Sequence, residues 1–218
     1  MNIDDFWYVE EAKDGEIRQI LTHILDCYKL MVSEKRELKN KENYIRNVLI
    51  RDYLTNATVK KQLRIQDYRF VPEAPVINEN YEEIGRTDIQ VILLSKFHDD
   101  NAIYRIECKR LDSQSPLNKY YVEGGIMRYI EGKYETFFES NGMLAFCVKT
   151  FDVESNTLKI NKYIDKLCIS NTHVKLTKNV FLDDSSHTYM SKHSLQLDTN
   201  SRFSLYHLML DFSTMIEN

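Results

Sequence analysis

Residues 104–109, within the segment from Ala102 to Arg110, carry apolar and charged side chains in strict alternation. The apolar positions are Tyr104, Ile106 and Cys108. The charged positions are Arg105, Glu107 and Lys109. Because successive side chains of a β-strand point to opposite faces, the segment is predicted to be a strand with one charged face. Burying an unpaired charge is costly, so a fold that covers this face has to give the charges partners.

Two further segments with period-two patterning precede this strand, from Tyr68 to Ile77 and from Arg86 to Leu94. The first two segments are separated by Asn, Glu and Gly residues, and the second and third by a His-Asp-Asp-Asn stretch. Such residues favour turns, so the three strands are predicted to form an antiparallel meander.

Two helices are predicted before the strands. Residues 14–33 have an apolar stripe at helical spacing, formed by Ile17, Ile20, Leu21, Ile24, Tyr28 and Met31. A second helix is expected over residues 40–54, with Asn40 as its N-cap and an apolar face formed by Ile45, Val48, Leu49 and Tyr53.

One more helix and one more strand are predicted after the third strand. Ser115-Pro116 is typical of a helix cap followed by proline at the first helical position, and the helix is expected to continue towards Phe138. Gly124-Gly125 within it indicates close backbone packing, a route for nucleic acid or a simple kink. The apolar run from Gly142 to Lys149 predicts a strand, so the order is helix, three strands, helix, strand.

The last third of the chain predicts a helix near 157–168, strands near 173–182 and 187–197, and a terminal helix from about residue 203. The apolar side chains of the terminal helix are interpreted as a docking surface or as core: Phe203, Tyr206, Leu210 and Met215. No linker, repeat or low-complexity stretch interrupts the 218 residues, so residues 1–218 are predicted to form a single domain with a mixed α/β (α+β) fold.

The cysteines and the N-terminal residues indicate a cytoplasmic protein. The four cysteines form no CxxC pair, which favours a reducing compartment over a disulfide framework or a zinc ribbon. The sequence MNIDDFWYVEE is acidic where a signal peptide is basic, and the apolar runs are too short to span a bilayer. We therefore expect no membrane association.

The net charge of −4 counts against binding to a polyanion unless basic residues gather locally. Several cations flank the charged strand in the sequence. They are candidates for phosphate contacts or for ordinary surface charges: Arg86, Arg110, Lys119, Arg128 and Lys133.

Asp88, in the second strand, is the candidate partner of the charged face. Antiparallel pairing could bring its carboxylate beside that of Glu107, and two carboxylates with a backbone carbonyl and water form the oxygen-rich site that Mg²⁺ prefers. Lys109 shares a face with Glu107, where its amine could orient water or stabilise charge on a phosphate. These residue types predict metal-dependent hydrolysis of a phosphodiester bond.

The same residues resemble the signature of the PD-(D/E)XK nuclease superfamily, with GRTD at residues 85–88 and IECKR at 106–110. Thr87 stands where that family has its proline. The restriction-endonuclease-like core of the family, αβββαβ, is similar to the element order predicted for residues 40–149. The resemblance therefore makes the first helix an N-terminal addition and residues 150–218 a C-terminal elaboration.

This resemblance implies Mg²⁺ as the cofactor, with Mn²⁺ as a substitute, bound by Asp88, Glu107 and the backbone carbonyl of Cys108. It implies that Lys109 is the catalytic lysine. It also implies a glutamate on the first core helix, for which Glu42 is the candidate, both as a catalytic residue and as a further metal ligand. The position of Glu42 on the apolar face of that helix predicts that it faces the sheet.

The implied function is that of a DNA endonuclease, favoured over one acting on RNA, that serves as the effector of a bacterial restriction or anti-phage system. Because the chain is acidic and has no separate recognition module, a homodimer or a larger protein complex is expected to supply specificity. The alternative is a catalytically silent nuclease-fold subunit that serves as a scaffold for nucleic acid or for assembly.

Each site residue also has a purely structural interpretation. Glu107 and Lys109 could form ion pairs with their neighbours on a solvated strand face. Asp88 could belong to a turn. Glu42 could be an ordinary acid in the first turn of a helix, where the helix dipole favours it.

Overall fold

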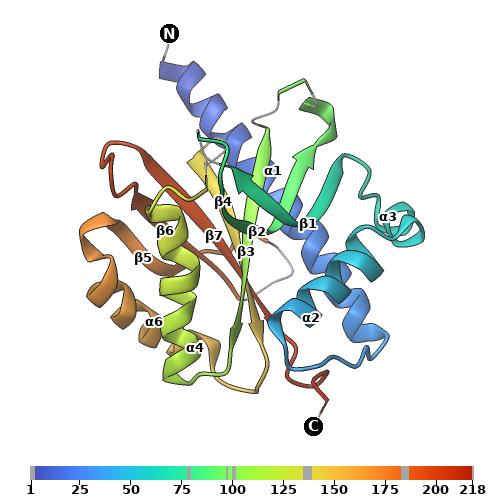
Figure 1. The fold of residues 1–218 in the computed structure, drawn as a ribbon. Helices are drawn as coiled ribbons and strands as arrows, with labels where there is room; N and C mark the ends of the chain where they lie inside the picture. The colour runs from blue at the N-terminus through green and yellow to red at the C-terminus, as the bar shows by residue number, and fades with distance from the viewer. Residues whose placement is uncertain are drawn as a thin grey trace.

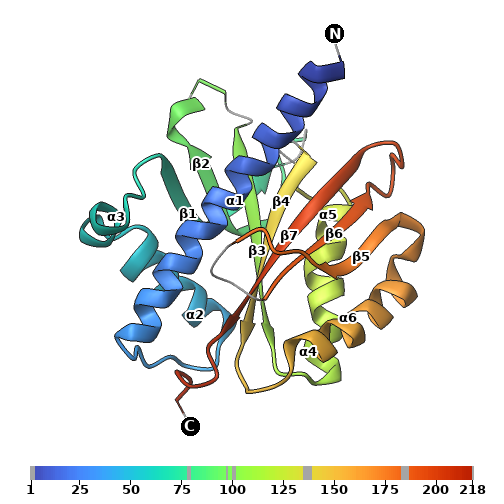
Figure 2. The same ribbon diagram turned by 180° about the vertical axis from the view of Figure 1, so that it is seen from behind.

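A seven-stranded mixed sheet forms the centre of the molecule, with helices on both faces (Figures 1 and 2). The computed structural model describes residues 3–77, 80–96, 98–99, 102–134, 139–182 and 187–217, with side chains from residue 15 onward. The strands are β1 (Tyr68–Ile77), β2 (Glu83–Leu93), β3 (Ile103–Leu111), β4 (Ser140–Cys147), β5 (Thr172–Lys178), β6 (Thr188–Ser194) and β7 (Arg202–Asp211). Their spatial order is β1-β2-β3-β4-β7-β6-β5.

Both antiparallel and parallel ladders occur in the sheet. The predicted meander of the first three strands is confirmed, because β1 pairs with β2 and β2 pairs with β3, both antiparallel. β4 then runs parallel to both β3 and β7. The strands β7, β6 and β5 complete the sheet with antiparallel pairs.

The first face of the sheet is covered by the N-terminal helices. Figure 2 shows α1 crossing this face diagonally, and the predicted apolar stripe of α1 is confirmed, with Ile17, Ile20, Leu21, Ile24 and Met31 buried. The helices on this side are α1 (Ile3–Ser33), α2 (Glu42–Val48), a π-helical continuation of α2 (Leu49–Leu54) and the short α3 (Ala57–Leu63). Together with the apolar side chains of β3, they form one hydrophobic core.

The second face is covered by the helices that follow β3, as seen from the front in Figure 1. They are α4 (Ser115–Tyr121), a π-helical segment (Val122–Ile126), α5 (Met127–Ile130) and α6 (Val153–Leu167). Close backbone packing at Gly125 is confirmed, because a Cβ there would lie 2.5 Å from Cε of Met143 and 3.6 Å from Cγ of Lys109. The helix ends at Ile130, and Phe138 lies outside the described residues.

Two predicted helix caps are wrong. Lys41 is the N-cap of α2, whereas the backbone and side-chain oxygens of Asn40 accept hydrogen bonds from the guanidinium of Arg110. Gln114 is the N-cap of α4, so that Ser115 is already helical and the proline falls within the first turn.

The predicted terminal helix is also wrong, because residues 202–211 form the central strand β7. Its side chains are apolar at nearly every position, and a short run of this kind fits a buried strand as well as a buried helix. Alternate residues enter the two cores, with Tyr206 and Leu208 on the α1 side and Leu205 and Met209 on the α4 side. The proposed docking surface is therefore core: Phe203, Tyr206, Leu210 and Met215 are all buried.

Among the described residues, no helix has the length and apolar character needed to cross a bilayer. All four cysteines are buried and free. Burial raises the pKa values of their thiols, with that of Cys27 at about 12, so these side chains behave as small apolar groups.

Candidate active site

The candidate site lies where β2 and β3 separate. Their ladder ends at the pair Ile89 and Ile106, so backbone groups further along β3 have no partner strand on that side. Two carboxylates bind these backbone groups in place of a partner strand. Asp88 Oδ2 accepts a hydrogen bond of 2.8 Å from the Cys108 N–H, and Glu42 Oε2 accepts one of 3.0 Å from the Arg110 N–H. Where β2 and β3 separate, Asp88 from β2 and Glu42 from α2 therefore lie along the same edge of β3.

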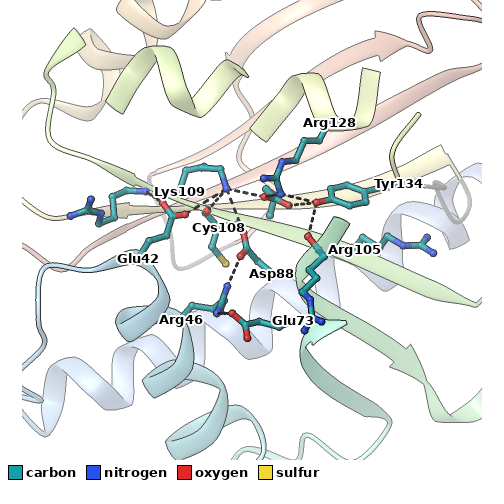
Figure 3. Close-up of polar contacts among 12 residues, drawn as sticks. Glu42, Arg46, Glu73, Asp88, Arg105, Cys108, Lys109, Arg128 and Tyr134 are labelled. Carbon is teal, nitrogen blue, oxygen red and sulfur yellow. Dashed lines mark hydrogen bonds and ion pairs between the residues drawn. The ribbon is translucent and has the colours of Figure 1, made fainter. Parts of the chain in front are cut away.

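The amine of Lys109 lies at the point where the predicted oxygen ligands meet (Figure 3). Its Nζ atom is 2.8 Å from Glu107 Oε1 and 2.8 Å from the carbonyl oxygen of Cys108. It is also 3.5 Å from Asp88 Oδ2 and 3.7 Å from Glu42 Oε1. All four residues predicted to ligate a cation thus surround one positive charge.

Burial separates this arrangement from an ordinary charged strand face. The side chain of Glu107 is 0% exposed and that of Lys109 is 2% exposed, so the interpretation as a solvated face is wrong, although the two charges do pair. Burial opposes the charge on Lys109, but the surrounding carboxylates, above all that of Glu107, outweigh it and raise the lysine pKa. Lys109 is therefore an ammonium ion at neutral pH.

The carboxylate of Glu107 has two more partners. Arg128 Nη1 donates a hydrogen bond of 2.6 Å to Oε1, and the Tyr134 hydroxyl donates one of 2.9 Å to Oε2. Burial nevertheless dominates and raises the pKa of Glu107 to about 7. Tyr134 also contacts the guanidinium of Arg128 at 2.9 Å, so the three side chains form one connected group.

Asp88 is held from its other side by Arg46, which sequence reasoning missed. Arg46 Nη1 lies 2.5 Å from Asp88 Oδ1, and Nη2 lies 2.5 Å from Glu73 Oε1. Burial favours the neutral form of Asp88, but Lys109, the Cys108 N–H and Arg46 together lower its pKa. Arg46 lies four residues after Glu42, and this helical spacing was a usable signal that the two share a face.

Glu73 has a left-handed backbone, with φ of 49°, which is unusual for a residue other than glycine. It falls between the pairs Pro72–Ile89 and Ala74–Thr87 of the β1–β2 ladder, and therefore lies across from Asp88. Arg46 thus bridges two carboxylates on neighbouring strands. The sequence gives no sign of this partner, because the strand register depends on the connection between β1 and β2.

A cleft of about 270 Å³ opens onto these side chains. Its lining includes the predicted cations Arg86, Arg128 and Lys133 and the half-exposed ring of Tyr120. Arg86 forms an exposed ion pair with Glu83 at 2.8 Å. The other two predicted cations lie outside this lining: Arg110 contacts Asn40, and Lys119 pairs with Glu123 at 3.0 Å.

The chemistry of these donors fits a hard divalent cation. The carboxylates of Asp88, Glu107 and Glu42 and the carbonyl of Cys108 are all oxygen ligands, and the ammonium of Lys109 already marks a place where they favour positive charge. In the described part of the chain, no group of three or more His, Cys, Asp or Glu side chains is arranged to hold a metal ion. The Lys109 amine lies between these oxygens, 2.8 Å from both Glu107 Oε1 and the Cys108 carbonyl. A cation would therefore need the amine to move aside.

Comparison of the chain with protein-family models, with curated proteins and with solved structures gave no match. The functional argument therefore depends on the residues and geometry of the site.

Proposed function

We propose that this protein is a Mg²⁺-dependent nuclease of the PD-(D/E)XK type. One observation carries the proposal: the oxygen atoms of Asp88, Glu107 and Cys108 meet around the Lys109 amine at the foot of an open cleft. A solvated ion-pair ladder would not be buried in this way. A purely structural buried pair would not need a cleft lined by further cations.

Asp88, Glu107 and the Cys108 carbonyl would hold the cation, with Glu42 as a further ligand. A divalent cation there would supply Lewis-acid activation of the phosphodiester and of the attacking water. Lys109 would donate a hydrogen bond to that water or to the phosphate oxygen that gains charge. Tyr134 fixes the orientation of the Glu107 carboxylate through its bond of 2.9 Å to Oε2.

The local charge of the cleft supports a phosphodiester substrate despite the net charge of −4. Arg86, Arg128 and Lys133 line the cleft around the acidic centre, and cations grouped in this way raise the local concentration of an anionic substrate. We propose DNA rather than RNA as the substrate, with a homodimer or a partner protein supplying sequence specificity. A role in a restriction or anti-phage system is part of the same proposal and depends on the family resemblance.

The test is incubation of the purified full-length chain with plasmid DNA, linear DNA and RNA, in Mg²⁺, Mn²⁺ or EDTA. Cleavage that requires the divalent ion is expected, and Asp88→Ala and Lys109→Ala should each abolish it. Lys119→Gln is a matched control, because it removes a surface charge that lies outside the cleft lining and pairs with Glu123. Circular dichroism of each variant separates loss of function from loss of fold.

A catalytically silent scaffold is the second candidate. The observation in its favour is that each carboxylate oxygen of Asp88 and Glu107 already accepts a hydrogen bond within the protein. A scaffold would bind nucleic acid without a divalent ion and would not bind Mn²⁺ at this centre. Titration of the protein with Mn²⁺ in the presence and absence of DNA therefore decides between the two functions, even where cleavage itself needs a missing partner.

A further inference from the structure

The acidic centre is crowded with protein cations. Asp88 contacts Arg46 through Oδ1 and Lys109 through Oδ2. Glu107 contacts both Lys109 and Arg128 through its single atom Oε1. A metal ion that used Glu107 Oε1 would compete with these two protein charges, and repulsion between like charges would weaken its binding while both stay.

The two arginines differ in how firmly they are held. The side chain of Arg46 is only 3% exposed, and its Nε, Nη1 and Nη2 atoms all donate hydrogen bonds, to Asn47, Asp88 and Glu73. The side chain of Arg128 is 27% exposed and lines the cleft. Its contacts with Glu107 and Tyr134 both use Nη1. Arg128 can therefore leave its carboxylate for the cleft, whereas Arg46 stays with Asp88.

We propose that Arg128 is a coupling residue that exchanges its partner, pairing with Glu107 in the metal-free protein and with a substrate phosphate once a divalent ion is bound. This inference rests on the proposed nuclease function and extends it. In Figure 3, Arg128 and Tyr134 lie above Asp88, whereas Arg46 and Glu73 lie below it. A phosphate entering the cleft would meet the guanidinium of Arg128.

After the exchange, Arg128, Glu107 and the phosphate each have a partner of opposite charge. A guanidinium matches a phosphate as well as it matches a carboxylate, because both present two oxygens to its planar donors. When Arg128 moves, Glu107 gives up one cation and gains another, and the phosphate gains the arginine. Tyr134 keeps Glu107 Oε2 in place through its own hydrogen bond, so the carboxylate does not have to rotate.

The thermodynamic consequence is reciprocal coupling between metal and nucleic acid. If a phosphate draws Arg128 away from Glu107, then DNA raises the affinity for the metal, and the metal raises the affinity for DNA by the same factor. A coupling of roughly tenfold is typical of such linked sites. Without Arg128 only Lys109 competes with the metal at Glu107 Oε1, so the metal should bind more tightly alone and should gain less from DNA.

The experiment measures Mn²⁺ affinity by calorimetry, with and without a duplex whose phosphorothioate backbone resists cleavage. For the unmodified protein, Mn²⁺ should bind about tenfold more tightly with the duplex than without it. For Arg128→Gln, Mn²⁺ alone should bind about tenfold more tightly than to the unmodified protein, and the duplex should add little. Lys119→Gln is the matched control, since Lys119 lies outside the cleft lining and forms an exposed pair with Glu123, and it should keep the coupling.

The outcomes separate this inference from the proposed function. Equal Mn²⁺ affinities for the unmodified protein and Arg128→Gln would overturn the exchange and leave the nuclease proposal standing. Absence of Mn²⁺ binding in every variant, with or without DNA, would overturn both. If Arg128→Gln fails to fold, Arg128→Lys provides the test, because lysine keeps the charge but cannot hold a phosphate through two parallel hydrogen bonds; undiminished coupling in that variant would also count against the exchange.

Discussion

Glu107 and His207 lie in one row of residues across the sheet, but their buried surroundings differ: those of Glu107 are charged and those of His207 are not. Glu107 on β3 pairs with Met143 on β4, and Met143 pairs with His207 on β7, so all three side chains share a face. Glu107 is an acid that contacts two cations beside an open cleft. His207 is 0% exposed and belongs to a series of hydrogen-bonded, uncharged groups, and its partners among the described residues are Tyr121 and Ser191.

The hydrogen bonds of this uncharged series have one consistent assignment of donors and acceptors. The Thr172 hydroxyl donates to the Cys168 carbonyl, so its oxygen accepts from Nδ1 of His193. Nε2 of His193 then accepts from Ser191, whose oxygen accepts from Nε2 of His207. The remaining nitrogen, Nδ1 of His207, accepts from the hydroxyl of Tyr121 at 2.8 Å. Every proton in the chain is used once, and both rings are neutral.

The contrast shows which buried polar groups indicate chemistry. The histidine chain needs nothing more, since each donor meets one acceptor and the surrounding core excludes water. The acidic centre holds more charges than a stable core requires, because replacing such ion pairs with apolar groups is often neutral or stabilising. A site that retains buried charge beside a cleft is therefore the better candidate for function.

Acid should destabilise the protein mainly through the histidine chain. Burial lowers the pKa values of His193 and His207 to about 3. Below pH 6.5 the unfolded chain takes up protons that the folded chain cannot, so this stability is complete above pH 6.5 and is lost as the pH falls towards 3. Each histidine should contribute up to about 5 kcal/mol of that loss.

Urea unfolding between pH 7 and pH 4 measures this effect. His193→Gln should be less stable at pH 7 but should show a shallower decline with acid. An unchanged pH slope in that variant would mean that the ring is not neutral in the folded protein.

Lys109→Met should have the next largest effect, because it leaves two buried carboxylates without their shared cation. Losing one partner of a buried ion pair costs about 3–5 kcal/mol. Mn²⁺ should restore part of this stability by taking the place of the amine. Thermal unfolding with and without Mn²⁺ provides the measurement, and Lys119→Met, in an exposed pair with Glu123, is the control. If the two substitutions cost the same, the acidic centre is not held by its charges.

Tyr121→Phe tests the uncharged chain with a smaller change. It removes the donor to Nδ1 of His207 and leaves that buried nitrogen without a partner, which should cost roughly 1–3 kcal/mol. Cleavage of DNA should be unaffected, since Tyr121 contacts none of the acidic groups through its hydroxyl. Chemical denaturation and the nuclease assay together check this separation, and a loss of activity without a loss of stability would contradict it.

Arg86→Gln should have the smallest effect on stability. Arg86 is 57% exposed and pairs with the exposed Glu83, and such surface pairs contribute about 0–1 kcal/mol. Unfolding measured at low and high salt should show little difference between the variant and the unmodified protein. A large change would place Arg86 among the groups that hold the acidic centre.

The sequence predicted the first two thirds of the fold well, because the patterns there are unambiguous. The limits of β1 agree with the predicted segment from Tyr68 to Ile77, and the alternation in β3 placed Glu107 and Lys109 on one face. The strand β7 was mistaken for a helix because both of its faces are buried, which removes the alternation on which the prediction depended.

The sequence predicted the acidic residues and the lysine of the site but missed Arg46 and Glu73, which lie beside them. Strand alternation and antiparallel pairing grouped Asp88, Glu107 and Lys109, and the family resemblance added Glu42. The structure brings all four together. The contact between Arg46 and Glu73 depends on a strand register and on an unusual backbone angle. Neither of these is encoded in local sequence patterns, and this limits what a sequence can reveal about such a site.

The central position of β7 affects how the molecule is made. β7 follows every other strand in the sequence, yet it joins β4 on one side and β6 on the other. Until β7 is synthesised, β4 and β6 each have an unpaired edge, and the apolar residues there are exposed to water. Such intermediates are prone to aggregation, so a chaperone that shields these edges until β7 has been made should improve the yield of native protein.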